Sequence, residues 1–240
     1  MAKTVVVLGA RNLGGAIVDH FLELGWSAAA VARSEDTLRR VRDRGALALA
    51  ADASDAAALA DALATARREL GSLDAVVNAV TASRPPAGGP FGGGPLAEAD
   101  IEAFRGWTVA VAEQAYVFLS VGSAALREAG GGGALVQITG GSSRRAMPGK
   151  GLWAAGAFAT RALVQAAAQE MRGEGIHAAL LAVDATIESP KTAGFTADTP
   201  RDALADMEGV AAAVAFLVQQ GPRALTHELV VTPSGDRWVP

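Results

Sequence analysis

Glycines interrupt the first apolar run of this chain at a spacing that can hold a phosphate group. Residues 5–8 read V-V-V-L, and residues 9–15 follow as G-A-R-N-L-G-G. The apolar run is typical of a strand buried on both faces, and apolar residues recur at helical spacing from Ala16 onward. Glycines let a backbone approach a pyrophosphate, whose charge the N–H groups and dipole of a helix N-terminus stabilise. The stretch predicts the first strand, turn and helix of a dinucleotide-binding fold.

A basic residue follows the second expected strand, residues 26–32. Folds that bind NAD usually have an acidic residue there, on the ribose 2′-hydroxyl. Arg33 occupies the position instead, and a guanidinium suits the 2′-phosphate of NADP through paired, charged hydrogen bonds. Arg11 in the glycine turn would add a second positive charge, although both arginines would also be stable as solvated surface residues. We therefore expect NADP(H) as the cofactor.

Further strands and helices alternate along the whole chain. Expected strands also cover residues 46–51, 73–80, 134–140, 176–183 and 229–231, and expected helices include residues 55–70, 107–128, 153–172 and 210–218. This alternation predicts an α/β fold, a doubly wound parallel sheet (Rossmann fold) of about seven strands with helices on both faces. At 240 residues we expect one domain, 1–240.

Two segments read as loops over the site. Residues 82–95, A-S-R-P-P-A-G-G-P-F-G-G-G-P, contain prolines and glycines that cannot propagate a helix or strand. The second loop covers residues 189–206, in which we expect a helix to begin near Thr199. The first loop follows the fourth strand and therefore falls on the ligand-binding side of the sheet.

Composition excludes several classes of function. The net charge is −4 with no basic block, which argues against nucleic-acid binding and against a polybasic membrane surface. There is no cysteine, and His20, His177 and His227 lack ligand spacing, so no metal site is expected. No signal-peptide core and no run of roughly 18 apolar residues is present, so we expect a cytoplasmic protein without membrane partners.

The opening turn resembles the Thr-Gly-x-x-x-Gly-x-Gly pattern of the short-chain dehydrogenase/reductase family. Gly9 and Gly15 match its outer glycines, while Leu8 and Leu13 replace the threonine and the middle glycine. Residues 73–80 resemble the family's central strand, Leu-Asp-x-x-Val-Asn-Asn-Ala-Gly. The resemblance implies a cofactor site formed by Gly9, Arg11, Asn12, Leu13, Gly15, Arg33, Asp52, Ala53, Asn78, Ala79, Asp184 and Thr186. Within it, Asp52 is expected at the adenine edge, and Asn78 is expected to pin neighbouring strands.

The resemblance breaks at the four catalytic positions. Residues 134–140 resemble the family's fifth strand and place Gly140 at the catalytic serine. Thirteen residues later, Trp153 stands at the catalytic tyrosine and Ala157 at the lysine, while Gln114 stands at the asparagine. Because two independently placed motifs keep the family's thirteen-residue spacing, we accept this register.

The replacements remove the family's proton transfer. An indole only donates hydrogen bonds and does not titrate near neutral pH, and a missing general acid costs about 10² to 10⁴ in rate. Ser142 and Lys150 are the candidate substitutes, together with Thr139, Ser143, Arg144 and Arg145 in the same loop. Asp184 and Glu188 would serve as carboxylate bases or simply as helix caps and solvated side chains. An indole at position 153 would also fill space near a nicotinamide ring.

Three functions stay open from the sequence. The first is an NADP(H)-dependent oxidoreductase that acts on a small carbonyl or alcohol through a non-standard site. The second is a catalytically silent NADP-binding regulator, and the third is a non-redox cyclase or dehydratase, which would need polar groups near Trp153. The resemblance also implies a homodimer or homotetramer through the helices near residues 107–128 and 153–172. The substrate itself cannot be read from the sequence.

Overall fold

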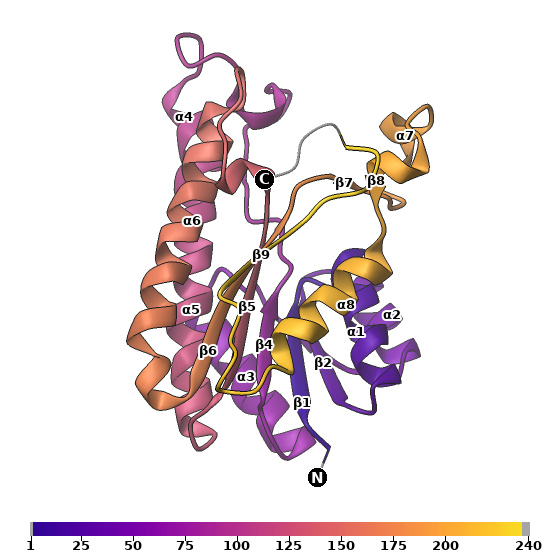
Figure 1. Cartoon of the computed structure of the whole chain (residues 1–240), viewed down its shortest axis with the longest axis vertical. Coiled ribbons are helices and arrows are strands. Elements are labelled where there is room, and N and C mark those ends of the chain that lie inside the picture. Colours follow the sequence, from indigo (N-terminus) through magenta and orange to yellow (C-terminus); the bar gives the residue numbers. More distant parts are fainter. Residues whose placement is uncertain (1, 237–240) are drawn as a thin grey trace.

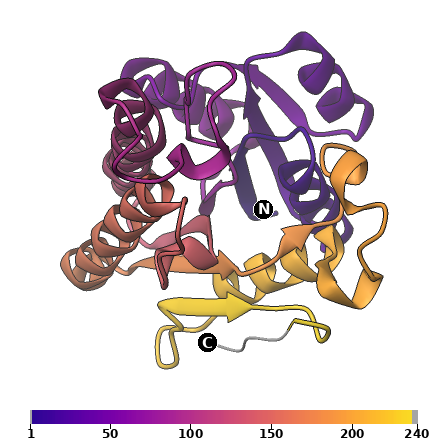
Figure 2. The same ribbon diagram turned by 90° about the horizontal axis from the view of Figure 1, so that it is seen from above.

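A single parallel sheet runs through the computed structural model, which describes residues 2–236 (Figure 1). Its order is β3-β2-β1-β4-β5-β6-β9, and every neighbouring pair is parallel. The predicted seven-stranded, doubly wound sheet is confirmed. Seen from above, β9 forms one edge of the sheet (Figure 2). The strands are β1 (Thr4–Leu8), β2 (Ser27–Ala32), β3 (Leu47–Ala50), β4 (Ala75–Asn78), β5 (Gly133–Gly140), β6 (Ile176–Val183) and β9 (Glu228–Val231).

Helices cover both faces of this sheet. On one face lie α1 (Leu13–Glu23), α2 (Glu35–Asp43) and α8 (Met207–Val218), and their buried residues form one apolar cluster with the sheet. On the other face α5 (Ala110–Glu128) lies between α3 (Ala56–Leu70) and α6 (Gly151–Glu170), over a second cluster. Two of these helices begin at side-chain N-caps: Ser34 accepts a hydrogen bond from the N–H of Thr37, and Asp55 accepts one from the N–H of Ala58.

The segment before α8 contains more secondary structure than the loop predicted over residues 189–206. It contains α7 (Ala193–Thr196), a 3₁₀ turn (Arg201–Ala203) and β8 (Leu204–Ala205), which pairs with β7 (Thr186–Ile187). The helix start expected near Thr199 is wrong, because only that single turn forms there. The helix begins after Asp206, whose carboxylate accepts a hydrogen bond of 2.7 Å from the N–H of Gly209.

One long helical segment, Ile101–Glu128, lies between the glycine-rich loop, residues 82–95, and β5. It comprises α4 (Ile101–Phe104), a π-helical turn (Arg105–Val109) and α5. By length and composition it could span a membrane, with a mean hydropathy of 1.4. In this fold α5 instead packs between α3 and α6 and contributes Phe118 to the buried cluster beneath it.

A buried histidine at the start of β6 predicts a pH dependence of stability. His177 is 6% exposed, its Nε2 lies 3.0 Å from the carbonyl oxygen of Thr226, and its ring lies 5.3 Å from that of His227. Burial lowers the pKa of His177 below its usual 6.5, and the charge of His227 adds to this. Between the pKa of His177 in the folded chain and its higher pKa in the unfolded chain, the unfolded chain binds a proton that the folded chain does not. The contribution of His177 to stability is therefore complete above the unfolded-state pKa and is lost as the pH falls towards the folded-state pKa.

We therefore expect the free energy of unfolding to decrease from pH 8 to pH 5.5, measured by urea denaturation. His177→Phe should flatten this dependence, whereas His20→Gln, on the outer part of α1, should keep it. An unchanged slope in His177→Phe would contradict the assignment.

Candidate functional site

The carboxyl ends of β1, β2 and β4 bring the predicted binding residues to one edge of the sheet. Leu8 pairs with Val31 of β2 and with Asn78 of β4, so the turns that follow these strands start side by side. The sheet order changes direction between β1 and β4, which is where ligands of such sheets bind.

The glycine turn is packed too tightly for side chains at two positions. Gly9 has φ +82°, and a Cβ there would lie 3.1 Å from the Cα of Val80. A Cβ on Gly14 would overlap the carbonyl oxygen of Gly9 and lie 2.8 Å from its carbonyl carbon. Sequence reasoning missed Gly14, because the family pattern has its middle glycine at the position of Leu13. The tight turn brings bare backbone to the ligand edge.

The helix that follows presents its first turn to the same edge. α1 starts at Leu13, and its N-cap Asn12 makes no side-chain capping hydrogen bond. The first N–H groups of a helix have no partner within the helix, so an anion is a suitable partner for them. Arg11 precedes them with an exposed side chain. The arrangement suits a pyrophosphate.

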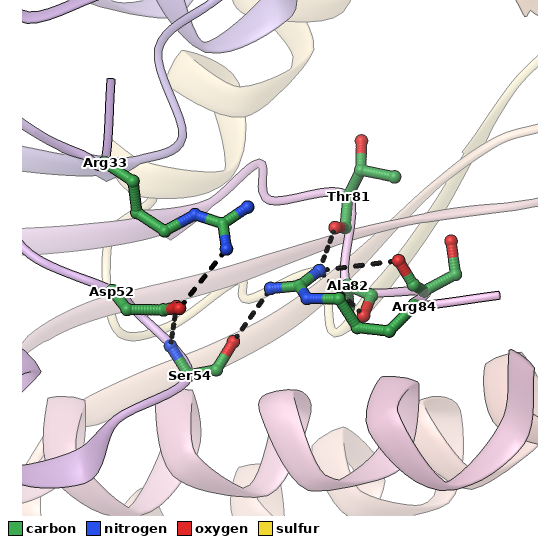
Figure 3. Close-up of polar contacts among 7 residues, drawn as sticks. Arg33, Asp52, Ser54, Thr81, Ala82 and Arg84 are labelled. Atoms are coloured by element: carbon green, nitrogen blue, oxygen red, sulfur yellow. Dashed lines mark hydrogen bonds and ion pairs between the residues drawn. The ribbon is translucent and has the colours of Figure 1, made fainter. Parts of the chain in front are cut away.

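Arg33 and Asp52 meet at the adjacent strand ends (Figure 3). Arg33 Nη1 lies 3.4 Å from Asp52 Oδ2, and the side chains are 64% and 42% exposed. The pKa of Asp52 is lowered, first by a hydrogen bond from the N–H of Ser54 and then by the charge of Arg33, so the carboxylate stays ionised. An exposed pair like this is held weakly and can exchange partners with a ligand. Next to Asp52, Ala53 is buried.

A buried amide cluster joins β4 to its neighbours. Asn78 Nδ2 donates to Oε1 of Gln114 and to Oε1 of Gln137, each at 2.7 Å. All three side chains are at most 5% exposed. Asn78 thus ties β4 to β5 and α5, as predicted for it. Because its amide is used in this cluster, Gln114 acts structurally here.

At the reacting end, the structure brings Gly140 and Trp153 together. A Cβ on Gly140 would lie 3.9 Å from Trp153 Cζ2, which supports the thirteen-residue register. The Trp153 ring packs edge-on against Phe91 at 4.7 Å and lies 6.1 Å from Trp107. Ala157, one turn further along α6, is buried. Aromatic rings therefore surround the position where the family has its tyrosine.

The glycine-rich loop is docked on the start of α6. The N–H of Gly94 donates to the carbonyl of Gly149 at 3.1 Å, and a Cβ on Gly93 would lie 2.7 Å from Leu152 Cδ1. Of the candidate substitutes, Lys150 places its ammonium 5.5 Å from the Phe91 ring centroid, whereas Ser142 is buried. Lys150 is thus the substitute that reaches the aromatic cluster.

Asp184 turns towards the loop after β5. Its side chain is 12% exposed and forms an ion pair with Arg145 at 3.3 Å. The carboxylate occupies the space that a side chain on Gly141 would need, so this glycine makes room for it. Thr186 is exposed on β7, and Glu188 pairs with Arg201 at 3.1 Å. Neither acid lies free at the position of a general base.

Comparisons with known proteins agree with this geometry. Residues 3–198 match a family model described as short chain dehydrogenase. A short-chain dehydrogenase from Rhodopseudomonas palustris is 24% identical with a TM-score of 0.72, and the alignment covers 96% of this chain and 98% of that one. A short-chain type dehydrogenase/reductase from Mycobacterium ulcerans is 21% identical with a TM-score of 0.81, covering 95% and 87%. A variant of actinorhodin polyketide ketoreductase with NADPH is 22% identical with a TM-score of 0.77, covering 99% and 98%. No curated protein sequence matches the chain.

Proposed function

Because the chain belongs to the short-chain dehydrogenase family, we propose that it is an NADP(H)-binding oxidoreductase with a non-standard active site. Its substrate is a small carbonyl or alcohol. The observation that carries the proposal is the exposed Arg33–Asp52 pair at the strand ends beside the Gly9 turn. A guanidinium at this place provides the 2′-phosphate with a charged partner, and the tight glycine turn brings its backbone to the same edge, where it would contact the pyrophosphate.

Different residues would bind different parts of the coenzyme. The turn from Gly9 to Gly15 and the start of α1 hold the pyrophosphate, and Arg33 binds the 2′-phosphate. When bound, the coenzyme supplies or accepts a hydride. Lys150, beside the aromatic cluster of Phe91, Trp107 and Trp153, is the group that we assign to proton donation. Without a tyrosine and its lysine, turnover is expected to be slow.

A silent NADP-binding regulator is the second candidate. The aromatic neighbours of Trp153 favour it, because they offer a reacting carbonyl no hydrogen-bond donor apart from indole N–H groups. The same neighbours argue against a cyclase or dehydratase, which needs polar groups at this place.

Two measurements separate these functions. Isothermal titration with NADPH, NADH and their oxidised forms tests binding, and NADPH oxidation with a panel of carbonyl compounds tests chemistry. Tight NADPH binding with turnover that Lys150→Met abolishes supports the oxidoreductase. Tight binding without turnover on any carbonyl supports the regulator, and no binding of either coenzyme refutes both.

Removing the Arg33 charge should change coenzyme preference. We expect Arg33→Met to weaken NADPH binding about tenfold or more, since a hydrogen bond to a charged group contributes roughly 1.5–3 kcal/mol. NADH lacks the 2′-phosphate, and its affinity should change little. Arg39→Met is the matched control, because Arg39 is also 64% exposed and pairs with Asp36. Equal losses for both coenzymes would contradict the assignment.

We also propose a homodimer or homotetramer formed through α5 and α6. Tyr116 on α5 and Phe158 on α6 are 60% and 42% exposed, and a second chain packed on these helices would cover them. Light scattering after gel filtration should give a multiple of 24.2 kDa, whereas a mass of one chain would contradict the proposal.

A further inference from the structure

Two arginines from distant parts of the chain face the turn after β3 (Figure 3). Arg33 follows β2 and contacts the Asp52 carboxylate at 3.4 Å. Arg84 comes from the loop after β4, and its Nη2 donates to the hydroxyl of Ser54 at 3.3 Å. Arg33 therefore pairs with a carboxylate, whereas Arg84 Nη2 contacts a neutral hydroxyl. The mouth of the proposed coenzyme site thus has an arginine side chain that contacts no carboxylate at this turn, where Asp52 pairs with Arg33 and Asp55 caps α3.

The head of Arg84 is held in place by its own loop. Its Nη1 donates to the carbonyl oxygens of Thr81 at 2.9 Å and Ala82 at 3.1 Å. These bonds use one end of the guanidinium and leave Nη2 directed at a neutral hydroxyl. Hydrogen bonds to the loop carbonyls alone would not require the contact between Nη2 and the Ser54 hydroxyl. A group held in this way loses little freedom when it binds a ligand.

The backbone of Arg84 is held by a hydrogen bond to the π-helical turn, residues 105–109. Its N–H donates to the carbonyl of Gly106 at 2.8 Å. A Cβ on Gly106 would overlap the carbonyl oxygen of Arg84 and lie 2.7 Å from its carbonyl carbon. Glycine at position 106 therefore lets the loop come close enough for the Arg84 side chain to reach Ser54.

We propose that Arg84 is a second arginine for the 2′-phosphate, which it would bind together with Arg33 beside the 52–54 turn. The inference rests on the proposed binding of NADP(H). The phosphate replaces Asp52 as the partner of Arg33 and replaces the Ser54 hydroxyl as the acceptor for Arg84 Nη2. The pKa of Asp52 is lowered chiefly by the hydrogen bond from the N–H of Ser54, and the charges of Arg33 and Arg84 add to this, so the ionised carboxylate offsets one of the two guanidinium charges.

The test uses Arg84→Met in the full chain, with NADPH, NADH and 2′,5′-ADP as ligands in isothermal titration. We expect binding of NADPH and 2′,5′-ADP to weaken about tenfold, as for loss of a charge-assisted hydrogen bond, and binding of NADH to change less than about twofold. Arg68→Met is the control, because Arg68 is 65% exposed on α3 and pairs with Glu69.

A second variant moves Arg84 without removing its charge. Gly106→Ala should push the loop away from the helix and reproduce the selective loss of NADPH affinity, with the far-ultraviolet circular dichroism unchanged. Wild-type NADPH affinity in both Arg84→Met and Gly106→Ala would overturn this inference and leave the proposed function standing. Equal losses of affinity for NADPH and NADH would do the same. If the wild-type chain binds neither coenzyme, the proposed function fails and the inference fails with it.

Discussion

Rebuilding the family's proton-transfer groups is expected to raise NADPH-dependent carbonyl reduction by about 10² to 10⁴, the usual contribution of a general acid. The variant carries Gly140→Ser, Trp153→Tyr and Ala157→Lys, which place serine, tyrosine and lysine at the positions that the resemblance assigns to them. The effect depends on the register between β5 and α6, which the closeness of Gly140 and Trp153 supports. Single-turnover oxidation of NADPH with a small ketone measures it.

The structure accommodates two of the three substitutions directly. A Cβ on Gly140 has its nearest neighbours at 3.8 Å and 3.9 Å, so serine fits. Tyrosine is smaller than tryptophan and leaves space beside Phe91. Ala157 is 2% exposed, so a lysine there must extend its charged group into the cleft, because burying an unpaired charge is costly. A thermal melt of the variant should therefore accompany the kinetics, to detect any loss of stability. The double variant without the lysine is the control. A triple variant that binds NADPH yet reacts no faster would contradict our placement of the reacting end.

Local sequence signals were sufficient to predict the sheet and the edge at which two of the candidate binding residues meet. Runs such as V-V-V-L before Gly9 bury on both faces, and the polar caps Ser34 and Asp55 fix where their helices start. Arg33 and Asp52 follow parallel strands directly, so the topology alone brings them to one edge. These features depend on residues close together in the sequence or on strand order.

Features that depend on how loops dock were not predictable in this way. Arg84 reaches Ser54 only because its loop lies against Gly106, and Phe91 reaches Trp153 only because the glycine-rich loop packs on α6. The periodicity of apolar residues in the sequence does not predict such contacts, because they join irregular backbone to distant helices. The start of α8 after its N-cap Asp206 was missed for another reason, because Thr199-Pro also resembles a helix start.

Gly14→Ala is expected to have the largest effect of any single methyl group added to the turn. The new Cβ would overlap the carbonyl oxygen of Gly9, a backbone atom that a side-chain rotation cannot move away. Relieving the overlap requires α1 to shift from β1, and overpacking of this kind costs about 1–3 kcal/mol. Because the same backbone is the proposed pyrophosphate site, NADPH affinity should fall at least about tenfold as well.

Two further glycine variants separate this effect from a general cost of alanine. Gly15→Ala places its Cβ 3.0 Å from the carbonyl oxygen of Ala10 and should be affected less than Gly14→Ala. Gly173→Ala, where nothing lies within 4 Å of the added Cβ, should stay within about 0.5 kcal/mol of the wild type in urea unfolding. If Gly14→Ala binds NADPH as the wild type does, the turn is not the pyrophosphate site, because a ligand that contacts this backbone must respond when the backbone moves.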